Sequence, residues 1–466
     1  MKMKKTLFAL AALALAATAA AQQPDVIIKI LSGERPVIAI PDFRGAGESQ
    51  RFMDVFNSTL WGDIQDSGLF KMAAKSFYPI AVPQRPQDFR APLPAPASRR
   101  RGAPPPQPIS QGPWLTDWSG PPVSANWLAF GYVGIQAEQL VLFGWLYNVN
   151  QQDLAGAQAF GKAYFGPVSE EGARKIAREF AADILSQLGG TGLAGSKIYY
   201  VSERARGKKE IWSMDYDGSN QKPLTFYNTI SITPSVSLDG TKLALTCFYR
   251  GGNPVIVVHS LETGRRLPFV NQSASVNATP SFTPDGKRIL FASTFAGSGT
   301  TQIFVANVDG GAFRRISFVR AIEVEPKVNP RTGTDIVFVS GRSGPPQIYK
   351  MNMEGANVER LTTGEGEAGN PSWHPDGRHI AFKWTRGFEP GNWNIFVMDV
   401  ATKEFVQLTH GMGRNENPSW APDGRHIVFS SNRNGSMQIW TMLADGTQLK
   451  QLTTQGRNTM PAWGKQ

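Results

Sequence analysis

Alternating apolar and polar positions recur in short runs through the C-terminal part of the chain, with turn residues between the runs. In one such run, Ile427 and Phe429 are separated by a single residue, which is the two-residue period of a β-strand. The preceding Pro-Asp-Gly at 422–424 predicts a turn, because proline presets φ and glycine accepts a positive φ. The strands of this unit are predicted at residues 418–420, 426–430, 437–442 and before 453. The pattern therefore predicts a small four-stranded sheet.

The same unit is repeated along the chain. The phrase Asn-Pro-Ser-Trp-Ala-Pro-Asp-Gly at 417–424 has a near copy at 370–377 and looser copies farther upstream. The leading prolines are spaced by 46, 46, 45 and 47 residues, and they are Pro234, Pro280, Pro326, Pro371 and Pro418. Self-similarity at this period, with four strands and a glycine turn in each unit, is typical of a β-propeller, whose radial packing leaves only short sheet edges.

The two ends of the repeat region predict how the ring closes. No first strand precedes the three segments that have the pattern of second, third and fourth strands, at 197–201, 210–215 and 223–225. At the other end, Pro461-Ala-Trp463 has the pattern of a first strand with no others after it. Joined, the two ends complete a sixth blade. We therefore expect a six-bladed β-propeller over residues 191–466 that is closed by the C-terminal strand.

Residues 22–190 predict a small α/β domain with two helices on a short sheet. Apolar residues at helical spacing predict helices at 48–67 and 172–188, and Ser169 is placed to cap the second helix. Strands are predicted at 26–30, 35–41, 139–145 and 157–165. The expected fold class is therefore mainly β, a six-bladed β-propeller with a small N-terminal α/β domain.

A proline-rich segment interrupts the N-terminal domain at residues 79–122. Thirteen of its 44 residues are proline, and Arg99-Arg-Arg101 lies in its middle. Such a composition favours an extended chain and does not support a packed core. We expect a disordered insertion here, and its role stays open.

The first 21 residues have the pattern of a signal peptide. Lysines at positions 2, 4 and 5 precede an apolar run at 7–17, and three alanines at 19–21 form a small-residue cleavage site. A retained N-terminal anchor is the alternative, but the run is short and rich in alanine for a membrane span. We expect an exported mature chain that begins at Gln22 and has no membrane span.

Charge and cysteine content add little to this picture. Removing the signal lysines takes the formal net charge from +11 to +8, which suggests an acidic partner or the anionic cell envelope. No basic patch interleaved with aromatic residues indicates nucleic acid. Cys247 is the only cysteine, so an intrachain disulfide is impossible.

No pattern in the chain indicates catalysis or a cofactor. The G-x-S-x-G motif is absent, and the five histidines lack zinc-like spacing. His379 and His426 occupy the same slot of two repeats, which we interpret as a surface position on a strand. The repeated Asp-Gly pairs are expected to form turns, and the recurring tryptophans are expected to pack the blades: Trp373, Trp420 and Trp463. We expect no enzyme, no cofactor and no metal site, and leave open a structural ion in the channel.

The chain resembles the TolB family, the periplasmic component of the Tol-Pal system, in two respects. Its parts follow the order signal peptide, α/β domain and propeller, and several short sequence motifs match. These motifs lie at residues 33–41, 66–70 (Asp-Ser-Gly-Leu-Phe), 172–188, 198–201, 215–220 and 461–463. The resemblance covers nearly the whole mature chain. One departure is the proline-rich segment, which is longer than expected for the family.

The resemblance implies a monomeric periplasmic adaptor that supports outer-membrane integrity and envelope constriction at cell division. It implies binding of the lipoprotein Pal over the mouth of the propeller channel, and binding of TolA through the mature N-terminal arm at 22–31. The Pal-binding residues that it implies are Val276, Asn277, Ala278, Thr279, Val324 and Glu325, with Asn370 and Asn417 added by repeat symmetry. The TolA-binding residues that it implies are Gln22, Gln23, Asp25, Val26, Ile27 and Ile28.

Other interpretations of the same residues stay open. The Asn and Thr side chains near the channel mouth are also the types that hydrogen-bond within their own turns. The arm could add a strand to a partner's sheet edge, or fold back on its own domain. Two other functions are an exported propeller enzyme, a lyase or glycosidase using Glu323, Glu325 or Glu416, and a carbohydrate-binding propeller.

Overall fold

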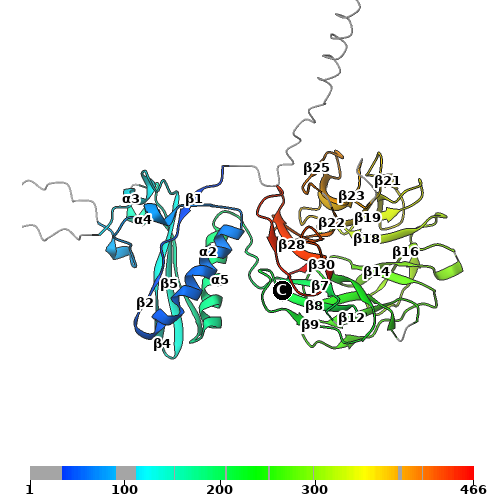
Figure 1. Cartoon of the computed structure of the whole chain (residues 1–466), viewed down its shortest axis with the longest axis horizontal. Coiled ribbons are helices and arrows are strands. Elements are labelled where there is room, and N and C mark those ends of the chain that lie inside the picture. The colour runs from blue at the N-terminus through cyan, green and yellow to red at the C-terminus, as the bar shows by residue number, and fades with distance from the viewer. Residues whose placement is uncertain are drawn as a thin grey trace, which may run out of the picture.

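The computed structural model describes residues 34–90, 112–151, 153–204, 207–249, 252–297, 299–386, 391–411 and 413–465. The predicted signal peptide, the arm at 22–31 and the central part of the proline-rich segment, 91–111, lie outside these residues. The described chain forms two lobes, an N-terminal α/β lobe and a propeller, which lie side by side (Figure 1). No helix in the described ranges is long and apolar enough to cross a membrane.

The N-terminal lobe is built on a six-stranded sheet in the order β3-β1-β4-β5-β6, with β2 beside β4. Its strands are β1 (Val37–Ala39), β2 (Arg44–Gly45), β3 (Lys71–Met72), β4 (Trp127–Gln136), β5 (Gln139–Asn148) and β6 (Gln158–Pro167). Its helices are η1 (Gly47–Phe52), α2 (Met53–Asp66), η2 (Lys75–Phe77), η3 (Pro86–Asp88), α3 (Thr116–Ser119), α4 (Leu154–Ala157) and α5 (Glu170–Ser186). The long strands β4, β5 and β6 are antiparallel, whereas β1 pairs in parallel with β3 and β4.

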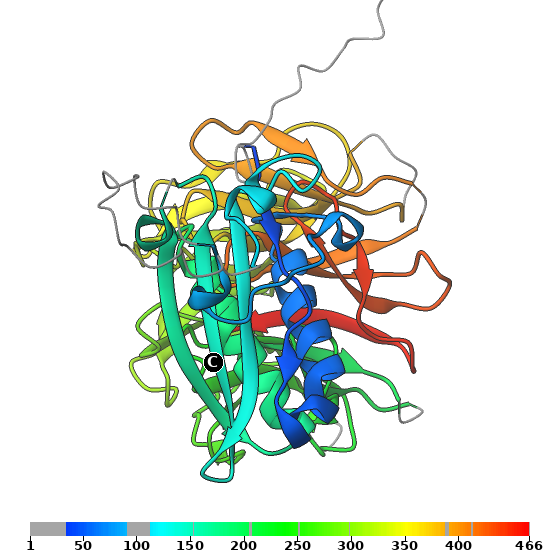
Figure 2. The same cartoon turned by 90° about the vertical axis from the view of Figure 1, so that its left-hand side faces the viewer.

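The two long helices cover one face of this sheet, and they lie between the sheet and the propeller (Figures 1 and 2). Phe56 and Leu60 of α2 and Phe180 of α5 are fully buried in one core with residues of β4 and β5. The hydroxyl of Ser169 accepts a hydrogen bond from the N–H of Gly172 at 3.1 Å, which caps α5 as the sequence predicts. Helix packing therefore places the C-terminal end of α2 beside the propeller.

The expectation that residues 79–122 cannot pack a core is wrong for both flanks of the segment. Phe89, Leu115 and Trp118 are buried in one core with Phe130 and Tyr147. Because successive side chains of a strand point to opposite faces, Phe130 and Tyr147 lie on the face of the sheet that the long helices do not cover. Proline content alone misled the prediction, because apolar side chains within the two flanks join the core on the second face of the sheet. Residues 91–111 are outside the described ranges.

The propeller consists of six four-stranded sheets, as predicted. The first blade contains β30 (Asn458–Gly464), β7 (Lys197–Ser202), β8 (Glu210–Asp215) and β9 (Lys222–Pro223). The second and third contain β10 (Ser231–Val236), β11 (Lys242–Cys247), β12 (Val255–Ser260) and β13 (Arg266–Leu267), then β14 (Asn277–Phe282), β15 (Arg288–Ser293), η5 (Phe295–Gly297), β16 (Gln302–Asn307) and β17 (Arg314–Arg315).

The remaining blades follow the same order from the channel outward. The fourth contains β18 (Glu323–Val328), β19 (Asp335–Ser340), β20 (Gln347–Asn352) and β21 (Glu359–Arg360). The fifth contains β22 (Ala368–Trp373), β23 (His379–Trp384), β24 (Asn394–Asp399) and β25 (Phe405–Gln407). The sixth contains β26 (Asn415–Trp420), β27 (His426–Ser431), β28 (Gln438–Leu443) and β29 (Lys450–Gln451).

The ring closes where its two ends meet in one sheet. Strand β30 pairs antiparallel with β7, with Ala462 opposite Tyr199 and Trp463 opposite Ile198. The indole N–H of Trp463 donates to the hydroxyl of Ser196 at 3.0 Å, and the ring is 8 % exposed. The predicted closure by the C-terminal strand is therefore confirmed.

Candidate partner-binding site at the channel mouth

Each blade carries one irregularity at the same place in its first strand. The pairing register of that strand shifts across the residue pair x-Pro in all six blades. The residue before the proline has a positive φ, between 49° and 56°, and these residues are Thr233, Thr279, Glu325, Asn370, Asn417 and Met460. Such bulges re-aim a side chain out of the regular pleat. Here they direct six side chains to one end of the central channel, where all six residues line a cavity.

We call these six residues the mouth ring. Hydrogen bonds link four of them from blade to blade: Thr279, Glu325, Asn370 and Asn417. The hydroxyl of Thr279 accepts from the N–H of Glu325 at 3.2 Å. The carboxylate of Glu325 accepts from the backbone N–H and the side-chain amide of Asn370, at 2.6 and 2.8 Å. Asn370 in turn accepts from the N–H of Asn417 at 3.3 Å. The side chains of Thr279, Glu325 and Asn370 therefore bond the next blade and not their own turns. Thr233 and Asn417 bond the second strand of their own blades.

The predicted Pal-binding residues differ in how accessible they are. Seven of them are half-buried at the mouth: Val276, Ala278, Thr279, Val324, Glu325, Asn370 and Asn417. Asn277 is 1 % exposed, and its amide is held by the hydroxyl of Ser293 and the carbonyl of Gln272. A side chain enclosed in this way offers almost no surface to a docked protein. Asn277 stays a prediction, and its burial makes it the least accessible of the eight residues, because the sequence does not separate the buried from the outward positions of a bulged strand.

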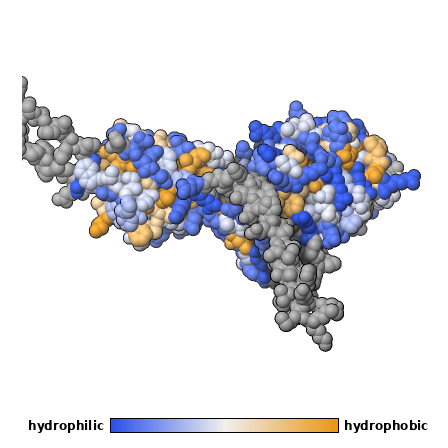
Figure 3. Space-filling model, turned by 90° about the horizontal axis from the view of Figure 1, so that it is seen from above, coloured by the Kyte–Doolittle hydropathy of each residue, from blue (hydrophilic) through white to orange (hydrophobic). Residues whose placement is uncertain are grey.

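Exposed apolar side chains near the mouth ring were missed by the sequence interpretation. Phe226 and Phe318 are 72 % and 74 % exposed, in the loops that join one blade to the next. Ile230 and Ile322 directly precede the first strands of the next blades and are 37 % and 61 % exposed. Alignment of the repeats could have revealed these residues. Phe226 and Phe318 occupy the position that holds Thr363, His410 and Thr454 in later repeats. Figure 3 shows hydrophobic patches on an otherwise largely hydrophilic propeller surface.

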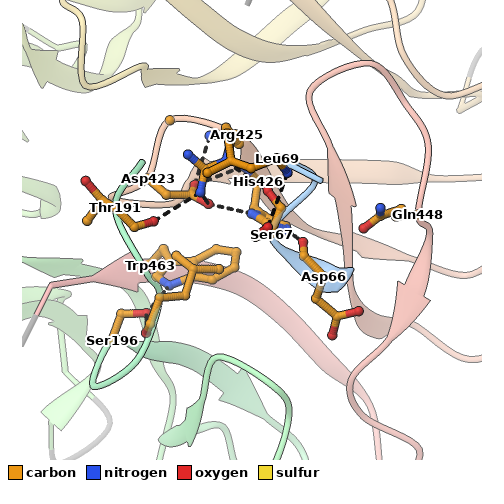
Figure 4. A network of polar contacts seen from close by, with 12 residues as sticks. Asp66, Ser67, Leu69, Thr191, Ser196, Asp423, Arg425, His426, Gln448 and Trp463 are labelled. Atoms are coloured by element: carbon orange, nitrogen blue, oxygen red, sulfur yellow. Dashed lines mark hydrogen bonds and ion pairs between the residues drawn. The ribbon is translucent and has the colours of Figure 1, made fainter. Parts of the chain in front are cut away.

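A second polar site joins the two lobes. The guanidinium of Arg425 donates to the carbonyl of Ser67 at 2.9 Å and to that of Thr191 at 3.1 Å. His426 lies between the carbonyl of Asp66, at 2.6 Å from Nε2, and the carboxylate of Asp423, at 2.7 Å from Nδ1. Figure 4 shows these side chains of the propeller turn directed at the end of α2 and at the linker. Residues 423–426 are called the joint turn below.

The joint turn corrects the interpretation of His426 as a surface position. His426 is 5 % exposed, whereas His379, in the same slot of the preceding repeat, is half-buried and pairs only with its own turn. Burial opposes ionisation of Asp423, but hydrogen bonds from His426 and the charges of His426 and Arg425 hold the pKa of Asp423 below its usual value. The aspartate of this Asp-Gly pair therefore has a role in joining the lobes as well as in its turn.

Asp63 of α2 meets the propeller beside the joint turn. It accepts a hydrogen bond from the hydroxyl of Tyr216, and Arg178 lies nearby, paired with Asp217 at 2.8 Å. Burial raises the pKa of Asp63 to about 6, although the hydrogen bond from Tyr216 and the charge of Arg178 oppose that shift. The interface between the lobes therefore contains a carboxyl group that titrates near neutral pH.

One cluster within the described ranges has the composition of a metal site. The ligand atoms of His374, Asp376 and His379 lie within 4.8 Å of one another. Both ring nitrogens of His374 are engaged, Nδ1 by the N–H of Asp376 at 3.0 Å and Nε2 by the carbonyl of Gly424 at 2.7 Å. A metal ion would have to displace at least one of these bonds, so the geometry fits a turn held by hydrogen bonds better than a metal centre.

The carboxylates considered for catalysis do not form an acid–base pair. Glu323 is fully buried and bonded to Arg342 and Ser340. Glu416 pairs with Lys383 and Arg414, both at 3.0 Å. Burial raises the pKa of Glu416, but these two cations outweigh burial and hold the pKa below its usual value, so Glu416 stays ionised near neutral pH. A glycosidase needs one protonated and one ionised carboxyl facing the same bond.

Comparison with known proteins identifies the family. The profile of the TolB beta propeller domain matches residues 187–388 and 365–466, which is more than half of the chain. The chain belongs to the TolB beta-propeller family. Among its TolB relatives, the Protein TolB homolog of Chlorobium luteolum is 36 % identical over 193 residues, 41 % of this chain and 42 % of that protein. The Tol-Pal system protein TolB of Bordetella pertussis is 32 % identical over 203 residues, 43 % of this chain and 44 % of that protein.

The TolB fold extends beyond the part that aligns in sequence. The alignments span less than half the length of these curated relatives. The crystal structure of TolB from Acinetobacter baumannii has a TM-score of 0.73 with this chain and covers 93 % of it and 98 % of that structure, at 22 % identity. Both lobes therefore share the TolB fold. The resemblance predicted from the propeller repeat and the phrase at 66–70 is confirmed at the level of the family and the fold.

Proposed function

We propose that this chain is a periplasmic adaptor of the Tol-Pal system that binds Pal over the mouth ring and TolA through the arm at 22–31. In this role it supports outer-membrane integrity and envelope constriction at division, without catalysing a reaction. The name of the Bordetella pertussis relative places that protein in the Tol-Pal system. The proposal extends that system to this chain.

The observation that carries the Pal site is the exposed apolar rim of the mouth. Phe226, Phe318 and Ile322 are each more than half exposed. Large apolar side chains grouped on one face of a soluble protein mark surfaces that a partner covers. The mouth ring beside them offers backbone and amide groups, so a docked protein would meet an apolar rim around a polar centre. Aromatic anchors of this kind carry most of the free energy of protein–protein binding.

The mouth ring itself is a poor place to test binding by mutation. Thr279 and Glu325 bond neighbouring blades, so replacing them would disturb the propeller as well as any partner contact. The rim residues avoid this difficulty, because their side chains extend into solvent. We expect the pair of substitutions Phe318→Glu and Ile322→Glu to weaken binding of purified Pal at least about 30-fold, the effect of losing an interface hot spot.

The matched control is Leu238→Glu. Leu238 is an apolar residue that is 52 % exposed, in the turn after the first strand of its blade, at the opposite end of the channel. Titration calorimetry should give wild-type affinity for this variant. Equal loss of affinity in both variants, or none in either, would place Pal elsewhere on the surface.

A mature chain lacking residues 22–31 tests the role of the arm. It should keep its affinity for Pal and lose its affinity for TolA, and unchanged TolA binding would contradict the role of the arm.

A further inference from the structure

One blade places a charge in the channel where the others place a small residue. The residue after the leading proline is small in five blades, Ser235, Ser281, Ser372, Ser419 and Ala462, and it is Lys327 in the fourth. Strand periodicity directs this position to the channel side in each blade, and all six residues line the channel cavity. The sequence interpretation did not single out this substitution, because it compared the prolines and not their neighbours.

Lys327 occupies the middle of the channel. It lines both the cavity of about 80 Å³ at the mouth ring and the cavity of about 200 Å³ at the opposite end. The other lining residues are uncharged, with the exception of Glu325. Hydroxyl groups of Ser281, Ser372 and Ser419 belong to the same wall, so the ammonium group lies among groups that can donate hydrogen bonds.

Within the described residues, no hydrogen bond or ion pair involves the ammonium group of Lys327. The nearest charge, Glu325, uses its carboxylate oxygens to accept two hydrogen bonds from Asn370. Burial lowers the pKa of Lys327, and Glu325 only partly opposes that shift. Lys327 is half-buried at the wall of the channel cavities. A cation that is partly withdrawn from water and has no partner is costly, so its retention here suggests a place for an anion.

We propose that the propeller channel binds one small anion, a carboxylate or phosphate group, at Lys327. The ammonium group would supply the charge, and the serine hydroxyls of the neighbouring blades would donate hydrogen bonds to the remaining oxygens. The cavity at the end of the channel opposite the mouth ring is large enough for a phosphate ion or for the carboxylate end of a side chain. Two sources fit this chemistry, a free ion from solution or an acidic side chain of the protein docked at the mouth. The second source rests on the proposed function.

The first test uses the isolated chain and inorganic phosphate. Thermal melting is recorded across a phosphate titration at constant ionic strength, with sodium chloride as the balancing salt. We expect phosphate at ten times its dissociation constant to raise the melting temperature of the wild type by about 3 °C. Lys327→Ser, which installs the residue of the other blades, should show no such rise. Lys287→Ser, which removes an exposed lysine and the same charge, should respond like the wild type.

A second measurement checks that the lysine is destabilising when no anion is bound. In a phosphate-free buffer, Lys327→Ser should melt at a higher temperature than the wild type, because the substitution removes a half-buried charge that has no partner. Lys287→Ser should leave the melting temperature unchanged. If Lys327→Ser instead melts lower than the wild type, the ammonium group already has a stabilising partner within the chain and the proposal is overturned.

A measurement of Pal binding separates the two sources of the anion. If phosphate has no effect, but Lys327→Ser binds Pal at least tenfold more weakly than both the wild type and Lys287→Ser, the carboxylate belongs to the docked protein. If phosphate has no effect and Lys327→Ser binds Pal normally, the channel has no anion site. If Pal does not bind the wild-type chain at all, the proposed function fails, and the phosphate titration alone decides the channel site.

Discussion

At the scale of single residues, the bulge before each proline determines how the blades are joined. In three blades the residue with a positive φ has its side chain bonded to the next blade: Thr279, Glu325 and Asn370. Asparagine serves twice in this position because it tolerates the left-handed region and carries both a donor and an acceptor. Met460 occupies the same conformation without either polar group, and the N–H of Met460 is instead bonded to the hydroxyl of Ser430 at 3.2 Å.

The backbone and side-chain roles of Asn370 can be separated by two substitutions. Asn370→Gly and Asn370→Ala both remove the side-chain bonds to Glu325 and Asn417 and keep the backbone N–H bond to Glu325, but only glycine accepts a φ of 52° without strain. We expect the alanine variant to be less stable than the glycine variant by about 1 kcal/mol. Urea denaturation of the two proteins measures this difference. Equal stability would show that the side-chain bonds alone account for the choice of asparagine.

Asp63 makes the stability of the protein depend on pH. Its pKa is about 6 in the folded protein and near 3.8 in an unfolded chain, so the folded state holds this proton more tightly. The contribution of Asp63 is therefore fully present below pH 3.8 and is lost as the pH rises through 6. We expect Asp63→Asn, which keeps an acceptor for Tyr216, to stabilise the protein at pH 7.5 by on the order of 2 kcal/mol.

The comparison with the wild type should be repeated across pH. The advantage of Asp63→Asn should shrink steadily as the pH is lowered from 7.5 towards 4, because the wild-type carboxyl group then becomes neutral. Arg178, Asp217 and Asp66 also influence this site, and their charges are unchanged in the variant. An advantage that is constant with pH, or a variant less stable at pH 7.5, would show that the carboxylate is paired in the folded state.

At the scale of elements, two nearly identical turns serve different purposes. The turns at 376–379 and 423–426 both read Asp-Gly-Arg-His. In the first, Arg378 is largely exposed and pairs with Asp399 of its own blade. In the second, Arg425 is 7 % exposed and bonds backbone carbonyls at the end of α2 and in the linker. Only the position of the blade relative to the N-terminal lobe distinguishes them.

This pair of turns supplies a matched test of the connection between the lobes. Arg425→Leu leaves the carbonyls of Ser67 and Thr191 without their donor, which we expect to cost about 2–3 kcal/mol and to separate the melting of the two lobes into distinct steps. Arg378→Leu removes a bond to the buried Asp399 within a single blade, so it should lower stability without separating the melting of the lobes. Differential scanning calorimetry distinguishes one transition from two. A single unshifted transition for Arg425→Leu would mean that other contacts hold the lobes together.

The same elements show what a sequence can and cannot reveal. The period of the prolines predicts the six blades and their closure, because each unit must bury its own apolar face against the next. The mouth ring was partly predicted, since Thr279, Glu325, Asn370 and Asn417 follow from the repeat, although Thr233 and Met460 were missed. The joint turn could not be predicted, because the turn at 376–379 has the same four residues but does not contact the described residues of the N-terminal lobe. The flanks of the proline-rich segment were misread because composition was averaged over buried and exposed positions.

At the scale of the whole molecule, one strand holds the ring closed. Removing residues 458–466 would leave β7 without its inner neighbour and would delete Trp463 together with its bond to Ser196. Loss of a buried tryptophan alone costs about 3–5 kcal/mol, so we expect the melting temperature to fall by about 10 °C or more. Truncation of residues 465 and 466 alone should have no effect. A melting temperature unchanged by the longer deletion would show that the other blades hold the ring without closure.

The pairing of β30 with β7 also has a consequence for the timing of biosynthesis. The two strands are separated by the entire remainder of the propeller, yet neither is complete without the other. A ribosome that adds residues at roughly 5–20 per second needs some tens of seconds to travel from one to the other. Throughout that interval the nascent chain carries an unpaired strand edge, so it is prone to mispairing and aggregation until its last strand has been made.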